Sequence, residues 1–98
     1  MFNLIIKPFA ELDATEAAKW YNLRKEGLGD EFLLVLDAKL NAIKRDPKQF
    51  TKLYKNIHRA LTERFPFGIF YIIEKEAIYV LAIVHTHRNP QYWKKRRN

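Results

Sequence analysis

The stretch FGIFYIIEKEAIYVLAIV, residues 67–84, decides the fold of this chain. It contains two runs rich in branched and aromatic residues, Phe67 to Glu74 and Ala77 to Val84, and this composition is typical of β-strands. The short polar segment Glu74-Lys75-Glu76 between them predicts a turn, so the two runs form a hairpin. The second run is eight residues long, well short of the ~20 residues that cross a bilayer. The N-terminus also lacks the features of a signal peptide, and we expect a soluble, cytoplasmic protein.

Two further strands are predicted on the N-terminal side of the hairpin. Ile57 to Glu63 has the same composition as the hairpin strands, and Phe2 to Lys7 is an apolar opening run that Pro8 ends. Residues 46–55 mix Pro, Lys, Gln and Thr around a few apolar anchors, so we expect them to form a connecting loop.

Two helices are predicted between the opening strand and that loop. Asp13 and Glu16 resemble a capping box, and apolar residues then recur at helical spacing as far as Gly27. A second amphipathic pattern begins after Gly29, continues to Ile43 and stops before Pro47. Pro90 can start a last short helix, Gln91 to Arg97.

This order of elements predicts an α+β fold in one domain, residues 1–98. It consists of a strand, two helices and three strands, with both helices on one face of a mainly antiparallel sheet and a short C-terminal helix. A chain of 98 residues is shorter than most domains and has room for one core.

The composition excludes several classes of chemistry. The chain has no cysteine, which removes disulfides, thiolate zinc sites and cysteine nucleophiles. Its three glycines form no phosphate-binding loop, and its basic half has too few carboxylates to hold two metal ions. We therefore expect neither a cofactor nor a metal.

The positive charge is concentrated in the second half of the chain. The net charge is +7; residues 1–43 carry five basic and seven acidic side chains, and residues 44–98 carry thirteen basic and four acidic ones. From His85 to Asn98 there are five basic residues and no acidic one. This segment attracts a polyanion or an acidic protein, or it serves solubility alone.

The segment His85-Thr86-His87-Arg88 is the first candidate for chemistry. Residues at i and i+2 share a face of a strand, so the two histidines converge if the strand continues that far. Three interpretations remain open: a metal pair without an evident third ligand, acid–base cleavage of RNA with Arg88 as a phosphate cation, or packing at a strand end.

Two arginines and an aromatic pair also have competing interpretations. Arg59 and Arg64 bind a phosphate, or they form salt bridges to helix carboxylates such as Glu31 or Asp37. Tyr92 and Trp93 precede a run of cations and could stack on a base. Alternatively Trp93 packs in the core, as large aromatic residues usually do.

The chain resembles the RelE/ParE superfamily of toxins from type II toxin–antitoxin systems, often labelled plasmid stabilization proteins. The resemblance spans nearly the whole chain and rests on these motifs: Leu28-Gly29-x-x-Phe32; Asp46-Pro47; Arg59; Arg64-Phe65-Pro66-Phe67-x-Ile69-x-Tyr71; and Val80-Leu81-Ala82-Ile83-x-His85-x-His87-Arg88-x-Pro90-x-x-Trp93-x-x-Arg96. It implies a compact sheet with two N-terminal helices, an antitoxin with an acidic arm as partner, and a toxin that is a monomer or a homodimer.

The two branches of this superfamily imply different targets. RelE-like toxins cut mRNA on the ribosome without metal, whereas ParE-like toxins poison DNA gyrase. Gly68 occupies the position of the strand arginine of the nuclease branch, and the C-terminal pattern resembles the ParE-like branch more closely. The resemblance therefore favours growth inhibition through a large target such as gyrase.

Each interpretation assigns its own residues. For the ParE-like toxin we expect the target-binding residues Arg88, Trp93, Lys94, Lys95 and Arg96. For the RelE-like nuclease we expect the catalytic set Arg59, Arg64, His85, His87, Arg88 and Tyr92. A non-toxic relative is the third interpretation, because Gly68 has no side chain with which to stabilise a phosphorane.

Overall fold

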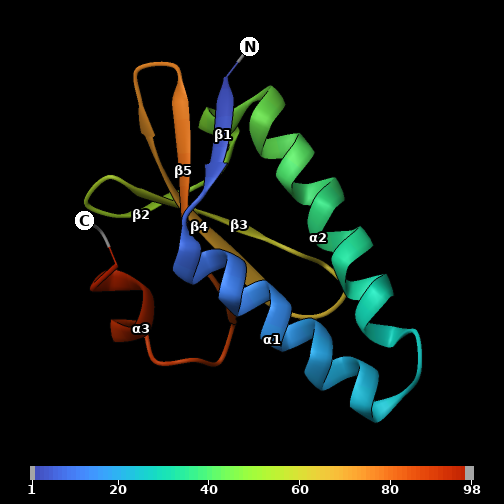
Figure 1. The fold of residues 1–98 in the computed structure, drawn as a ribbon. Coiled ribbons are helices and arrows are strands. Elements are labelled where there is room, and N and C mark those ends of the chain that lie inside the picture. The colour runs from blue at the N-terminus through green and yellow to red at the C-terminus, as the bar shows by residue number, and fades with distance from the viewer. Residues whose placement is uncertain (1, 97–98) are drawn as a thin grey trace.

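The computed structural model describes residues 2–96, and one five-stranded sheet organises it (Figure 1). The elements in chain order are β1 (Asn3–Ile6), α1 (Pro8–Arg24), α2 (Leu28–Arg45), the 3₁₀ helix η1 (Pro47–Gln49), β2 (Lys52–Tyr54), β3 (Ile57–Leu61), β4 (Phe67–Glu74), β5 (Ala77–His85) and α3 (Gln91–Lys94). The predicted hairpin of β4 and β5 is confirmed, as is the predicted α+β architecture.

The sheet has the order β1-β5-β4-β3-β2. Neighbouring strands are antiparallel except for β1, which pairs parallel with β5 and places Asn3 opposite Ala77. Phe70 faces Ala82 and Tyr71 faces Val80, so Leu81 is an extra residue that makes a β-bulge in β5. The hydrophobic hairpin therefore lies in the middle of the sheet, where both of its faces can be covered.

The two faces of the sheet are covered by different parts of the chain. Helices α1 and α2 form a hairpin on one face, where Tyr21, Phe32, Phe65 and Phe67 pack ring against ring. Gly29 allows the two helices to approach closely, because a Cβ at this position would lie 2.1 Å from the Ala18 carbonyl oxygen.

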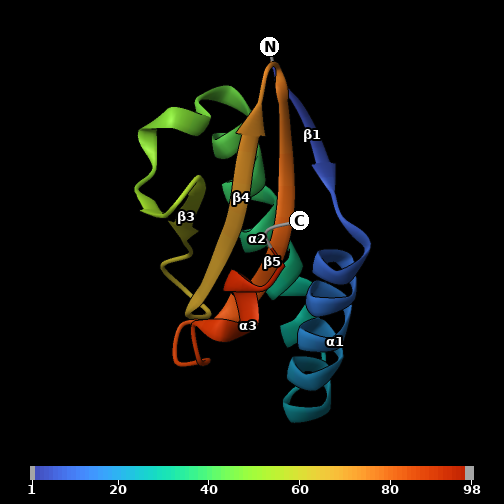
Figure 2. The same cartoon turned by 90° about the vertical axis from the view of Figure 1, so that its left-hand side faces the viewer.

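The opposite face carries a second apolar cluster that the C-terminal segment covers. Trp93 of α3 is buried against Phe70, with their ring centroids 4.4 Å apart and the rings nearly parallel. This packing holds α3 at the end of the sheet opposite to the β4–β5 turn (Figure 2). The interpretation of Trp93 as a core residue is confirmed.

Several predicted boundaries differ from the structure. Pro8 starts α1 as its first residue and does not merely end the opening strand, because a helix N-terminus tolerates the missing N–H. Asp13 therefore lies inside α1 and does not cap it. Residues 46–55, predicted as a loop, contain η1 and the edge strand β2. The last helix ends at Lys94; the predicted Arg97 end lies outside the described residues.

Candidate functional site

The candidate site is built where β5 ends and the chain turns back toward α3. Two backbone hydrogen bonds fix this turn: the Thr86 N–H donates to the Pro66 carbonyl at 2.9 Å, and the Arg88 N–H donates to the His85 carbonyl at 3.0 Å. The turn carries Arg88 into solvent, while His85 stays half-buried against Phe67. The site therefore combines a fixed histidine with an exposed arginine.

His85 and His87 come together through this turn and not along a strand. The strand stops at His85, so the two residues do not share a strand face, yet their ring centroids lie 5.2 Å apart. The His87 backbone N–H donates to His85 Nδ1 at 3.1 Å. Since Nδ1 accepts this bond, the neutral His85 ring carries its proton on Nε2.

Three of the predicted catalytic residues line one small cavity of about 140 Å³. Arg59 enters it from β3, His85 from the end of β5 and Arg88 from the turn, and Trp93 and Gly68 form part of the wall. A Cβ at Gly68 would lie 2.9 Å from the Phe70 ring and 3.5 Å from Arg59 Cδ. A larger residue at position 68 would therefore require Phe70 to move.

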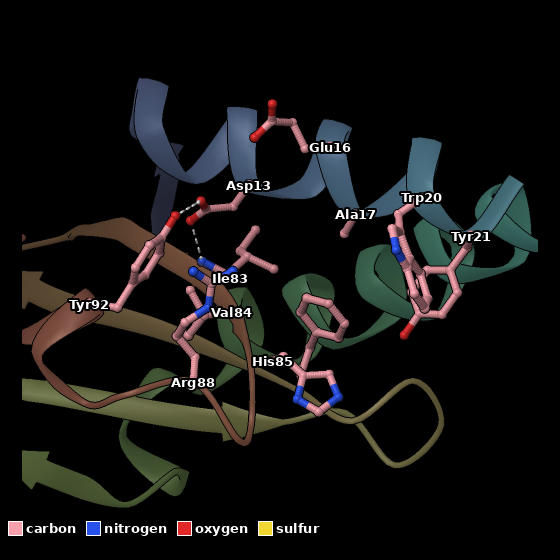
Figure 3. Close-up of a pocket in the computed structure, with 11 residues that line it drawn as sticks. Asp13, Glu16, Ala17, Trp20, Tyr21, Ile83, Val84, His85, Arg88 and Tyr92 are labelled. Atoms are coloured by element: carbon pink, nitrogen blue, oxygen red, sulfur yellow. Dashed lines mark hydrogen bonds between the residues drawn. The ribbon is translucent and has the colours of Figure 1, made fainter. Parts of the chain in front are cut away.

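A second hollow lies between α1 and the C-terminal segment (Figure 3). Its volume is about 330 Å³, and Asp13, Glu16 and Trp20 from α1 face His85, Arg88 and Tyr92 across it. Trp20 is half exposed at its edge. His85 and Arg88 line both cavities, so they stand on the ridge between them.

Asp13 binds the C-terminal segment to the rest of the fold. Its Oδ2 accepts the Ile83 N–H at 3.0 Å, and its Oδ1 accepts the Tyr92 hydroxyl at 3.2 Å (Figure 3). The Arg96 guanidinium donates to both carboxylate oxygens, with Nη2 3.2 Å from Oδ1. We call Asp13, Tyr92, Arg96 and the Ile83 N–H the Asp13 cluster.

The Asp13 cluster is largely removed from solvent. The side chains of Arg96 and Asp13 are 15% and 9% exposed. Burial lowers the pKa of Arg96, but the hydrogen bond and the charge of Asp13 outweigh it and raise the pKa above its usual value. Arg96 is therefore a permanently charged partner of a buried carboxylate.

The five residues of the predicted target-binding set have very different environments. Arg88 and Lys95 are exposed, and the Arg88 guanidinium lies 4.4 Å from the Tyr92 ring centroid. Lys94 is partly buried, with Nζ 4.6 Å from the Tyr54 ring centroid. Trp93 and Arg96 face inward. Of the five residues, Trp93 and Arg96 therefore hold α3 in place, and Arg88, Lys94 and Lys95 stay candidates for target binding.

Two other predicted residues take separate positions. Arg64 forms an exposed ion pair with Glu31, with Nη1 2.8 Å from Oε1, and lies on the Phe65 ring. Arg59 makes no ion pair within residues 2–96, so the alternative of a bridge to Glu31 or Asp37 is not found for it. The structure thus brings Arg59, His85 and Arg88 together and places Arg64 elsewhere.

Asp13 is the residue that sequence reasoning assigned wrongly. Its position relative to Ala10, Ala14 and Ala17 places it on the apolar stripe of α1, at i+3 from the buried Ala10. A carboxylate on such a stripe requires a partner, because an unpaired buried charge is costly. The spacing from Ala10 indicates that Asp13 is buried and paired, and the capping-box interpretation overlooked this indication.

The described part of the chain offers no cluster of three or more His, Asp or Glu side chains arranged to hold a metal ion. In the same residues, no helix has the length and apolar character needed to cross a membrane.

Comparison with known proteins identifies the fold. No protein-family model matches the sequence, and no curated protein matches it. Among solved structures, the chain is similar to one described as "Chromosomal ParDE TA system from P. aeruginosa". The TM-score is 0.79 with 15% sequence identity, and the match covers 87% of this chain and 96% of that chain. The likeness confirms the ParE-type fold that the motifs predicted.

Proposed function

We propose that this chain is the toxin of a type II toxin–antitoxin system and acts by binding a large cellular target, with DNA gyrase as the first candidate. The observation that carries the proposal is the exposed positive charge around α3, on a fold similar to that of the ParDE structure. Arg88, Lys94 and Lys95 form what we call the C-terminal face. None of the three has a carboxylate partner within residues 2–96.

The C-terminal face suits binding better than it suits catalysis. Two of its cations, Arg88 and Lys95, are exposed on a rigid base, because Trp93 and the Asp13 cluster hold α3 against the sheet. A prepositioned charged surface steers an anionic partner and loses little entropy on binding. The same surface would receive the acidic arm of an antitoxin, which would then block access to the target.

Gyrase inhibition tests the proposal directly. Purified protein is added to gyrase with relaxed plasmid and ATP, and supercoiling and cleaved DNA are followed on a gel. We expect loss of supercoiling with the native protein and its retention with Arg88→Glu. Lys19→Glu on α1 is the matched control, since Lys19 is exposed and lines neither cavity of the candidate site. Normal supercoiling at an excess of native protein would exclude gyrase as the target.

A metal-independent mRNA endonuclease is the second candidate, and the cavity shared by Arg59, His85 and Arg88 favours it. Cleavage by the 2′-OH requires a base, an acid and cations near the phosphorane. His85 could exchange a proton, and the two arginines could bind the phosphate. Exposed His87 and the tethered Tyr92 hydroxyl lie beside this set.

Primer extension on a translated mRNA separates the two candidates. A nuclease leaves new 5′ ends within codons, and Arg59→Gln abolishes them without affecting expression of the protein. An intact transcript during growth arrest would exclude cleavage.

Induced expression without an antitoxin tests the hypothesis that the protein is a toxin. Growth arrest that a co-expressed acidic partner reverses supports the toxin, and unimpaired growth supports a non-toxic relative.

We also propose that residues 1–98 form a single toxin domain, which is a monomer or a homodimer when no antitoxin is bound. Light scattering of the purified chain checks this oligomeric state.

A further inference from the structure

A third hollow, lined by lysines, lies at the other end of the sheet from α3. It has a volume of about 610 Å³ and opens where η1, β2 and the β4–β5 turn meet. Its lining residues are Lys48, Phe50, Lys52, Asn56, His58, Ile73 and Lys75. None of these residues lines either cavity of the candidate site. We call this hollow the lysine pocket.

The charge of the lysine pocket has one sign. Lys48, Lys52 and Lys75 come from three separate segments and are all exposed, and no carboxylate is among the lining residues. Within the described chain none of the three makes an ion pair. Glu74 and Glu76 flank Lys75 in the turn but do not line the pocket. Three like charges line one hollow that has no carboxylate among its lining residues, an arrangement that favours an anionic ligand.

A buried histidine completes the pocket wall. His58 is 8% exposed, and its Nδ1 lies 3.0 Å from the Phe50 carbonyl oxygen. A carbonyl only accepts, so Nδ1 carries a proton and donates. Within residues 2–96, every fully buried side-chain nitrogen or oxygen has a hydrogen-bond partner. Nε2 has no such partner in that range, so it is not fully buried. Nε2 therefore reaches solvent in the pocket, where the neutral ring presents it as an acceptor.

The histidine is held rigidly by the residues beneath it. Its ring stacks on Tyr71, with centroids 5.3 Å apart and an interplanar angle of 13°. The Tyr71 hydroxyl donates to the Pro47 carbonyl at 2.7 Å. Burial, and then the charge of Asp46, raise the pKa of Tyr71 well above its usual value, so this donor keeps its proton. The imidazole at the pocket wall is thus positioned before any ligand arrives.

We propose that the lysine pocket binds a phosphate group. Phosphate oxygens accept several charge-assisted hydrogen bonds, which three ammonium groups can donate from different sides. Lys52 lies directly across the β2–β3 pair from His58, so one cation stands beside the ring. The phosphate belongs either to a nucleic-acid strand or to free phosphate, since both present the same oxygens. The proposal does not depend on the toxin activity.

The imidazole signals of His58 provide a local measurement. In ¹⁵N–¹H correlation spectra of the whole protein, inorganic phosphate is titrated at constant ionic strength against sodium chloride. We expect a saturable shift of the His58 Nε2 signal with phosphate and none with chloride. A response equal to that of chloride would overturn the proposal.

Substitutions of the lysines show whether the pocket itself binds. Lys52→Gln and Lys75→Asn should each weaken phosphate binding about threefold to tenfold, since each removes one of three charges. Asparagine is chosen because Lys75 has a positive φ of 57°, which asparagine tolerates. Lys19→Gln on α1 should bind as the native protein does. Equal binding by all three variants would overturn the proposal, and thermal unfolding checks that each is folded.

A short single-stranded DNA, without phosphate in the buffer, identifies the source. If it shifts the same His58 signal and Lys52→Gln weakens it, a nucleic-acid strand is the occupant. If inorganic phosphate alone shifts the signal, the occupant is free phosphate. Toxicity assays with Lys52→Gln are read separately, so failure of the toxin proposal would leave this result standing.

Discussion

The two ends of the sheet both carry positive charge, but they use it differently. At the α3 end, Arg96 is buried against Asp13 and Trp93 fills the apolar cluster, so part of the basic segment is structural. At the opposite end, the three lysines of the lysine pocket have no carboxylate partner in the described chain. The count of cations in a segment therefore does not tell which of them are available for binding. The position of the nearest carboxylate decides it.

Trp93 should give the largest effect at the α3 end. Trp93→Ala removes a buried indole stacked on Phe70, and we expect the free energy of unfolding to fall by about 3–5 kcal/mol. Trp20→Ala is the control, because Trp20 is 52% exposed and should change stability by less than about 1 kcal/mol. Urea unfolding measures both. Equal effects would show that α3 is not part of the core.

Asp13 should give the next largest effect. Asp13→Asn leaves the buried Arg96 without its charge partner, and we expect a loss of about 3 kcal/mol in unfolding free energy. Glu16→Gln, an exposed carboxylate on the same helix, should stay within about 0.5 kcal/mol. If Asp13→Asn is as stable as the native chain, the division between structural and available cations at this end is wrong.

Tyr71 tests how rigidly the residues beneath the lysine pocket are held, through the pH dependence of the free energy of unfolding. Tyr71→Phe removes the hydrogen bond to Pro47 and should cost about 1 kcal/mol at neutral pH. Because burial and Asp46 raise the pKa of Tyr71 in the folded state, the unfolded chain loses this proton first. The contribution of Tyr71 to the free energy of unfolding is complete below about pH 10 and falls by about 1.4 kcal/mol per pH unit above it.

The pH dependence is measured as a difference between native and Tyr71→Phe stability. This difference should be flat up to about pH 9 and should shrink at higher pH. A difference that grows with rising pH would mean that the folded state holds the phenolate.

The C-terminal face should give the smallest effect on stability and a large one on function. Arg88→Glu and Lys95→Glu reverse exposed charges, so unfolding free energies should stay within about 0.5 kcal/mol of native. We expect both variants to lose growth inhibition in an induced-expression assay. Full toxicity in a stable double variant would place the target contact elsewhere.

The sequence predicted the parts of the fold whose signals are local. The hairpin of residues 67–84 and the helix ending before Pro47 follow from composition and periodicity, and both are present. The edge strand β2 was missed, because its three residues, Lys52, Leu53 and Tyr54, are too few to show an alternation. Short strands of this kind are stabilised by hydrogen bonds to a neighbouring strand, here β3.

The candidate site was less predictable because its contacts are distant along the chain. Arg96 looks like any member of a basic tail, and only a carboxylate 83 residues earlier makes it structural. In the same way, the meeting of Arg59 with His85 and Arg88 depends on how three strands and a turn align. Local patterns supplied the residue types, and the tertiary fold selected which of them meet.

The pairing of β1 with β5 has a consequence for synthesis on the ribosome. β1 and both long helices are made first, but the strand that pairs with β1 begins only at Ala77, and the guanidinium that binds Asp13 comes at Arg96. The apolar side of the helix hairpin therefore stays uncovered while most of the chain is translated. The finished tertiary structure, and any activity that depends on it, appears only after Arg96 has left the exit tunnel.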